Sequence, residues 1–271
     1  MAEGRGAGPA GVDRTALLAD LRAESELLDE VVAGVADWRT ATPAPGWTVA
    51  HQIAHLAWTD EKAHLAATDA AGFHDEVERA AADIDGYVDG GAERIAAQDP
   101  AQVLQQWRRG REALATALAD APDGARVPWY GPPMGVASMI TARLMETWAH
   151  GQDVLDALGQ RREPTRRLRH IARLGVRTRD FAYTAHGMAP PEEEFHVELT
   201  GPDDEVWDFG PKHAQDRVSG PALDFCLVVT QRRHPDDTGL MVSGVGARQW
   251  IAIAQAFAGP PGQGRKAGEF A

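Results

Sequence analysis

The hydrophobic pattern of the N-terminal half predicts long amphipathic helices. Between Val12 and about Asp37, leucine and valine residues recur every three or four positions, which places them on one helical face. The same spacing follows Thr48, whose hydroxyl is suited to cap a helix N-terminus. The predicted helical segments are 12–37, 48–69, 75–120 with interruptions near Gly90–Gly91 and Asp99–Pro100, and 136–158. Because no strand-like alternation separates them, the pattern indicates a four-helix up-and-down bundle over residues 12–158.

The C-terminal half has a mixed pattern. Its predicted elements are a helix at 164–186, two strands at 195–201 and 205–210 that form a hairpin, and helices at 221–231 and 247–257. Together they describe a small α+β unit, which we assign to residues 159–258. Glycine, proline and alanine dominate residues 1–11 and 259–271, so both termini are expected to be flexible.

Composition excludes several classes of protein. The 271-residue chain has 27 Lys and Arg against 40 Asp and Glu, a formal net charge of -13, which argues against nucleic acid as the main partner. The single cysteine, Cys226, excludes a disulfide within the chain, and its apolar neighbours predict a buried residue rather than a nucleophile. We find no apolar segment long enough for a membrane span or a secretory signal, and therefore expect a cytoplasmic protein.

Two pairs of residues with metal-binding chemistry lie one helical turn apart on separate predicted helices. His51 and His55 fall in the second helix, and Glu146 and His150 in the fourth. Ligands at this spacing can reach one ion, because a helical turn spans only about 5.4 Å. Two imidazoles and one carboxylate suit zinc with an open fourth position, which is typical of catalytic sites. Since His51 lies in the first turn, a surface or supporting role is favoured for it; a solvated pair remains the alternative for Glu146 and His150.

Further residues surround these candidate ligands in the sequence. Trp58, Trp129 and Tyr130 are candidates for the wall of a substrate or cofactor pocket, although tryptophans in bundles are commonly core residues. Arg143, one turn before Glu146, is either a contact for an anionic ligand or part of a structural salt bridge. Asp153 either accepts the second N–H of the neighbouring histidine or lies at the surface.

Arginines are concentrated in a single segment. Eight fall within residues 161–179, and five of them have helical spacing: Arg162, Arg166, Arg169, Arg173 and Arg177. Pairing with internal acids such as Glu192–Glu194 is favoured over binding of an anionic ligand. RNA is a third possibility, raised by a resemblance of the C-terminal segment to part of the tRNA wyosine-forming enzymes, and the negative net charge argues against it.

Two longer motifs carry a resemblance to a known family. GWTVAHQIAHLA, followed about ninety positions later by ARLMETWAHGQDVLDALG, resembles the DinB-like bundle of the mycothiol-dependent maleylpyruvate isomerases, and in particular their uncharacterised actinobacterial metal-binding relatives. The resemblance extends to WYGPPM and to the C-terminal segments. It implies that His55, Glu146 and His150 hold a divalent metal, most simply zinc. It also implies a catalytic arginine from the C-terminal unit, for which Arg232 is the first candidate and Arg233 the second.

These observations lead to one principal hypothesis and two alternatives. The resemblance implies a metal-dependent enzyme that acts on a small organic molecule with mycothiol or a similar thiol, by isomerisation or thiol transfer. Trp58, Trp129, Tyr130 and Arg143 are the predicted cofactor contacts, and a homodimer is compatible with the sequence. A hydrolase or lyase that uses metal-activated water is the first alternative. A non-catalytic metal or ligand sensor is the second.

Overall fold

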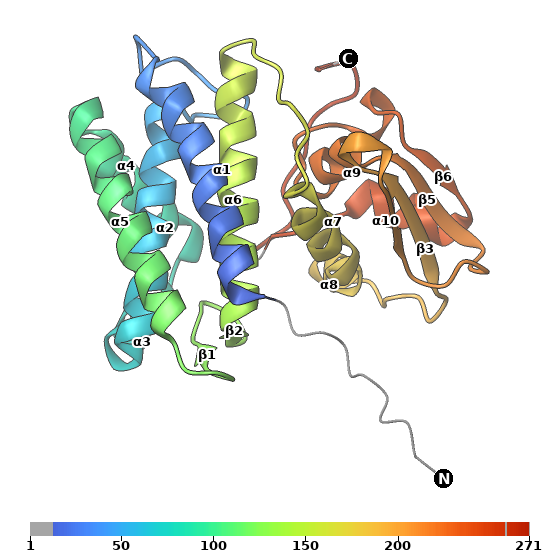
Figure 1. The fold of residues 1–271 in the computed structure, drawn as a ribbon, viewed down its shortest axis with the longest axis horizontal. Coiled ribbons are helices and arrows are strands. Elements are labelled where there is room, and N and C mark those ends of the chain that lie inside the picture. Colours follow the sequence, from blue (N-terminus) through green and yellow to red (C-terminus); the bar gives the residue numbers. More distant parts are fainter. Residues whose placement is uncertain (1–12, 258, 271) are drawn as a thin grey trace.

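The computed structural model describes residues 13–257 and 259–270, which form a helical bundle beside a smaller α/β unit (Figure 1). The predicted helical start at Val12 and the predicted flexible segment 1–11 lie outside the described residues. In the N-terminal half the elements are α1 (Arg14–Ala33), α2 (Val49–Thr68), α3 (Ala70–Ala80), α4 (Ile84–Ala96), α5 (Pro100–Asp120), β1 (Arg126–Val127), β2 (Met134–Gly135) and α6 (Val136–Ala157). None of the helices in these described ranges is long and apolar enough to cross a membrane.

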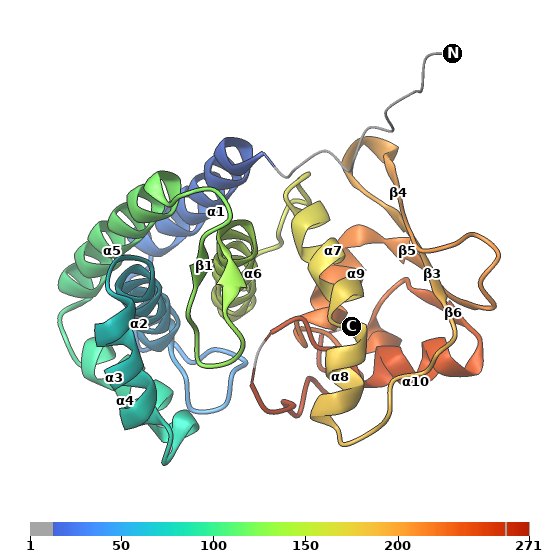
Figure 2. The same cartoon turned by 90° about the horizontal axis from the view of Figure 1, so that it is seen from below.

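The long helices α1, α2, α5 and α6 form the predicted four-helix bundle. Helix α2 packs against α5 and α6, and α6 also packs against α1 (Figures 1 and 2). The stretch predicted as one interrupted helix is three helices, and its first break lies at residues 81–83 rather than at Gly90–Gly91. Gly91 lies inside α4. The residue is a glycine because the indole of Trp58 packs against it and leaves no room for a Cβ. The close approach of Trp58, and not a turn of the chain, therefore explains why position 91 is a glycine.

The C-terminal half contains more strands than the sequence pattern predicts. Its elements are α7 (Leu168–Arg177), α8 (Arg179–Ala185), β3 (Phe195–Thr200), β4 (Val206–Phe209), β5 (Asp216–Pro221), α9 (Ala222–Val229), β6 (Met241–Ser243) and α10 (Val245–Ile253). The predicted hairpin is present as β3 and β4, and the sheet order is β4-β3-β5-β6. Strand β5 pairs with β3 in parallel, and α9 begins directly after β5. The helix predicted at 164–186 is two shorter helices that meet at Thr178.

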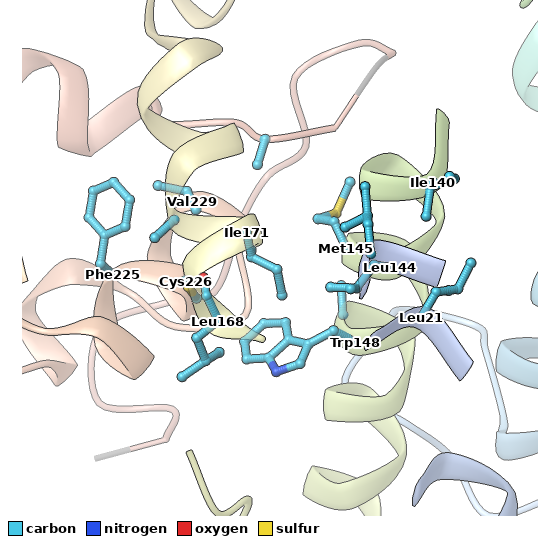
Figure 3. Packing of buried hydrophobic residues seen from close by; sticks show 14 of the residues in the cluster. Leu21, Ile140, Leu144, Met145, Trp148, Leu168, Ile171, Phe225, Cys226 and Val229 are labelled. Carbon is cyan, nitrogen blue, oxygen red and sulfur yellow. Dashed lines mark hydrogen bonds between the residues drawn. The ribbon is translucent and has the colours of Figure 1, made fainter. Parts of the chain in front are cut away.

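A continuous apolar core joins the two halves. Trp148 of α6 lies between the bundle core and Leu168 of α7, and Cys226 and Phe225 of α9 lie on the far side of α7 (Figure 3). Cys226 is fully buried, as predicted, and burial raises the pKa of its thiol. Because this thiol is protonated and inaccessible, it is suited to packing and not to nucleophilic attack. The core therefore fixes the C-terminal unit against α6, the helix that carries Glu146.

The arginine-rich segment is largely bound internally. Arg162 and Arg167 both donate to the buried carboxylate of Glu24 on α1, at 2.5 and 2.9 Å. Arg166 pairs with Glu205 at 2.9 Å. The acidic partners thus differ from the expected Glu192–Glu194. Arg162 and Arg166 precede α7, so the five arginines do not share one helix. Three remain exposed on α7: Arg169, Arg173 and Arg177.

The C-terminal residues 259–270, for which the composition predicts flexibility, make contacts with the rest of the chain. Arg265 donates to Asp153 of α6 at 2.7 Å. The backbone N–H of Gly268 donates to Asp237, and the ring of Phe270 lies under the guanidinium of Arg233.

Candidate metal centre

The structure brings His55, Glu146 and His150 together between α2 and α6. Oε2 of Glu146 lies 3.6 Å from Nε2 of His55 and 3.2 Å from Nε2 of His150. One ligand atom from each of the three residues lies within 4.8 Å of the others. We call these three residues the bundle cluster. Their side chains are mostly buried, because α2 and α6 pack directly against each other.

A chain of hydrogen bonds fixes the proton of His150. The hydroxyl of Thr42 donates to the carbonyl of Trp47, so its oxygen accepts the amide N–H of Gln52 at 2.9 Å. The carbonyl oxygen Oε1 of Gln52 therefore faces Nδ1 of His150, at 2.5 Å, and accepts its proton. The other nitrogen of a neutral His150, Nε2, then presents a lone pair to the carboxylate of Glu146. Two lone pairs that face each other in this way favour a cation between them.

The ionisation states of the cluster support this arrangement. Burial, followed by the charge of His55, lowers the pKa of His150 to about 4, so this imidazole is neutral at physiological pH. Burial alone would raise the pKa of Glu146, but the polar contacts of its carboxylate with the imidazoles of His150 and His55 hold this pKa well below its usual range. A neutral imidazole beside an anionic carboxylate is the protonation state that a divalent metal requires of its ligands. The donor set fits zinc.

His51 lies outside the cluster and has another function. Its Nδ1 lies 2.8 Å from the hydroxyl of Thr48 and accepts the backbone N–H of the same residue, which closes a capping box at the start of α2. Its Nε2 lies 2.8 Å from the carboxylate of Glu93 on α4. Both ring nitrogens are thus occupied by other partners, in agreement with the supporting role favoured by its position in the first turn.

Trp47 is a residue of the site that sequence reasoning missed. Its ring centroid lies 5.3 Å from that of His55 and 5.9 Å from that of His150. It therefore covers one side of the cluster from the loop before α2. Its position directly before the capping threonine places it near the first turns of α2, and this was the only signal in the sequence.

The predicted aromatic contacts form a row that leads away from the cluster. The ring of Trp58 lies 6.5 Å from His55 and stacks on Tyr130 at 6.3 Å. Trp129 lies one ring further and stacks on Phe73 at 5.7 Å. The hydroxyl of Tyr130 is buried without a partner among the described residues, and burial raises its pKa. Trp58 therefore lies directly beside His55. Tyr130 and Trp129 are connected to His55 only through the ring of Trp58.

Arg143 has a structural partner inside the bundle. Its Nε donates to Asp60 at 3.0 Å and its Nη2 donates to the hydroxyl of Thr59 at 2.6 Å. Arg143 is 2% exposed, so this buried ion pair accounts for its polar groups. This contact corresponds to the structural salt bridge considered for Arg143, with Asp60 in place of Glu146 as the partner. The predicted contact of Arg143 with a cofactor stays a prediction without a geometric argument.

Asp153 takes neither of the two positions considered for it, because His150 donates its Nδ1 proton to Gln52 and Asp153 itself is buried. Asp153 is 1% exposed and accepts hydrogen bonds from Arg232 at 2.9 Å and from Arg265 at 2.7 Å. Asp153 points to the C-terminal unit and not to the histidine, because its negative charge is paired with the two arginines from that unit. Arg232 is thereby attached to α6 three residues after His150, and its charge contributes to the lowered pKa of this histidine. Arg233 instead forms two hydrogen bonds with Asp156.

A second group of potential ligands lies on the sheet: His196, Glu198 and Asp208, which we call the sheet cluster. Glu198 of β3 lies directly opposite Asp208 of β4 in the antiparallel register. Nε2 of His196 lies 3.1 Å from Asp208, and the ammonium of Lys212 lies 3.3 Å from the same carboxylate. The ammonium of Lys212 thus already compensates the charge of Asp208.

A His–Glu–His set that faces inward from two packed helices is the arrangement from which metal sites in helical bundles are built. Comparison with known proteins specifies the class further. The sequence profile of the family described as "Mycothiol maleylpyruvate isomerase N-terminal domain" matches residues 21–155. A second profile, described as "Wyosine base formation", matches residues 191–242, the segment in which the sequence resembles those enzymes.

Relatives and solved structures agree with the first profile. The chain is 55% identical over 250 residues to uncharacterized proteins of two Mycobacterium tuberculosis strains, with 92% of this chain and 97% of each relative covered. The crystal structure of a mycothiol-dependent maleylpyruvate isomerase is similar with a TM-score of 0.55 and 18% identity, over 86% of this chain and 93% of that one. At this identity the likeness shows the fold. The chain belongs to the mycothiol-dependent maleylpyruvate isomerase family.

Proposed function

We propose that the protein is a zinc-dependent cytoplasmic enzyme that uses mycothiol, or a similar thiol, to isomerise a small organic molecule or to transfer the thiol to it. One observation supports this proposal most strongly: in the bundle cluster a carboxylate oxygen faces two imidazole nitrogens, and the contact with Gln52 leaves His150 without a proton for that oxygen. The family profile, which is named for mycothiol and for an isomerase, supplies the chemistry.

His55, Glu146 and His150 would hold the metal. When bound there, zinc supplies a Lewis acid that favours the thiolate form of a thiol, a soft ligand for this ion. Gln52 keeps His150 in the tautomer whose Nε2 is free to ligate. The ring of Trp47 limits the access of water to the two imidazoles.

Arg232 is the residue we propose for binding negative charge on the substrate. Its two Nη atoms donate to the carbonyl of Thr230 and to Asp153, and this fixes the plane of the guanidinium. Its Nε is buried without a partner among the described residues, so one donor is available to a carboxylate or an enolate oxygen. The cofactor contacts that fit this geometry best are Trp58 and Tyr130, which stack in a row that begins at His55.

Calorimetry with mycothiol and an assay with maleylpyruvate test the proposal. We expect the zinc-loaded protein to bind the thiol, and Glu146→Gln to lose both zinc and thiol binding. Asp208→Asn, in the sheet cluster, serves as the matched control and should bind both normally. Thiol binding of equal strength in chelator-treated protein would contradict the proposal.

Turnover without a thiol distinguishes the principal alternative. If the zinc-loaded protein converts a substrate at full rate in the absence of any low-molecular-weight thiol, metal-activated water is the nucleophile and the thiol-dependent proposal is wrong. If turnover requires the thiol and is lost in Arg232→Gln but partly kept in Arg232→Lys, the proposed role of Arg232 is supported.

A further inference from the structure

A cavity of about 500 Å³ lies in the C-terminal unit, between α9, α10, β6 and residues 262–265 of the C-terminal segment. Its volume is in the range that holds a small organic ligand. None of the three residues of the bundle cluster lines it. The cavity is therefore separate from the candidate metal centre. We propose that it binds an organic anion, a carboxylate or phosphate attached to an apolar group. This inference does not depend on the proposed function.

The lining combines an apolar surface with arginines. Val228 of α9 and Ile251 of α10 supply apolar side chains. Arg233, Arg248 and Arg265 also line the cavity, and Asp236 is the carboxylate among the described lining residues. Guanidinium groups bind carboxylates and phosphates through paired N–H donors, which an ammonium group does not offer. The chemistry thus matches a ligand with one anionic end and one apolar end.

Arg233 is paired with Asp156, but the other two lining arginines, Arg248 and Arg265, are not fully neutralised by the protein. Arg265 shares the carboxylate of Asp153 with Arg232, so two guanidinium groups meet one acid. The Nε of Arg265 is buried and has no partner among the described residues. Arg248 is exposed and makes no ion pair within the described part of the chain. In a protein of net charge -13, a local excess of positive charge at a concave surface favours anions over other ligands.

The position of Arg265 links this cavity to the metal centre. Arg265 lines the cavity and donates to Asp153, which lies three residues after His150 on α6. Arg232 donates to the other oxygen of the same carboxylate. A bound anion that attracts Arg265 therefore acts on the network that also positions Arg232. The cavity is separate from the cluster but is coupled to it by this shared carboxylate.

Three probes that share a phenyl ring test the proposal: benzoate, phenyl phosphate and the neutral benzamide. Each is titrated into the full chain by calorimetry, and its binding is also observed by saturation-transfer NMR. We expect at least one of the two anions to bind with a stoichiometry of one, and benzamide to bind at least about tenfold more weakly. Binding of benzoate alone identifies a carboxylate ligand, and binding of phenyl phosphate alone identifies a phosphate. The absence of binding for both at millimolar concentration overturns the proposal.

Matched arginine variants locate the site. Arg248→Gln should weaken anion binding about tenfold, and Arg248→Lys should weaken it less. Arg169→Gln removes an equally exposed arginine from α7, outside the cavity, and should leave binding unchanged. Glu146→Gln should also leave it unchanged, so failure of the metal proposal would not affect this test. Equal weakening by Arg169→Gln and Arg248→Gln, or none by Arg248→Gln, would show that the probes bind elsewhere and would overturn the assignment.

Discussion

The bundle cluster and the sheet cluster contain similar donors in different surroundings. Each combines imidazole and carboxylate groups whose atoms lie within 4.8 Å. In the bundle cluster the hydrogen bond that His150 donates to Gln52 fixes the tautomer of His150, and both histidine side chains are at most 12% exposed. In the sheet cluster the ammonium of Lys212 lies beside Asp208, whose side chain is 35% exposed.

This difference shows why proximity of ligands is a weak criterion for a metal site. Burial would raise the pKa of Asp208, but Lys212 and His196 keep it lowered, so its charge is already compensated. The carboxylate of Glu146 instead faces nitrogen atoms of which one cannot donate. The bundle cluster therefore needs a cation, whereas in the sheet cluster the ammonium of Lys212 already supplies one. Each prediction below changes one of these features.

Removal of the central carboxylate has the largest expected effect. Glu146→Gln should weaken zinc binding by at least about a thousandfold, or roughly 4 kcal/mol, because it removes one of three ligands and the only negative charge among them. Competition with a zinc-binding dye measures this change. Asp208→Asn should leave the affinity unchanged; a similar loss in both variants would show that the two clusters are not different in kind.

Acid should destabilise the metal-free protein through His150. Its pKa falls from 6.5 in the unfolded chain to about 4 in the folded one, so between these pH values the unfolded state binds more protons. Stability is therefore complete above pH 6.5 and decreases as the pH falls toward 4, by about 2–3 kcal/mol. Urea unfolding of chelator-treated wild type and His150→Gln measures the effect, which should be smaller in the variant. Equal acid sensitivity of the two proteins would contradict the assigned cause.

Loss of the orienting amide should have an intermediate effect. Gln52→Leu removes the acceptor for Nδ1 of His150 and should weaken zinc binding about 10–100-fold while leaving the ligands in place. Competition with the same zinc-binding dye measures the change. Gln105→Leu, at an exposed position of α5, is the control and should behave like wild type. An unchanged affinity in Gln52→Leu would mean that the tautomer of His150 is fixed by other means.

The smallest expected effect concerns the sheet cluster. Lys212→Gln removes the compensating ammonium and should raise the pKa of Asp208, while the free energy of unfolding should change little because the pair is exposed. Metal titration should then detect, at most, a weak second ion. A tight second site in wild type would invalidate the contrast between the two clusters.

Much of the bundle and of the bundle cluster could be predicted from local patterns. Helical periodicity identified the four long helices, and i, i+4 spacing on two of them identified His55, Glu146 and His150. Both signals depend on the geometry of a single helix, which sequence spacing reports directly. The single buried cysteine could be predicted for the same reason, since its neighbours on both sides are apolar.

The missed features depend on contacts between distant segments. Gln52 lies three residues before His55, but nothing on α2 indicates that its amide reaches a histidine of α6. Either a hydrogen bond with His150 or a surface position was considered for Asp153, but its buried carboxylate accepts hydrogen bonds from arginines about 80 and 112 residues away. Strand β5 escaped prediction because DRVSGP lacks alternation and pairs in parallel with β3. Such partners are determined by tertiary packing, which sequence spacing does not report.

X-ray absorption at the zinc edge, recorded with and without mycothiol, tests the central claim most directly. The account predicts two imidazole nitrogens and oxygen donors at about 2.0–2.2 Å in the zinc-loaded protein, and one sulfur at about 2.3 Å after the thiol is added. It also predicts the same spectra for Asp208→Asn. A spectrum with no imidazole contribution, or one that remains unchanged when saturating thiol is added, would contradict the account.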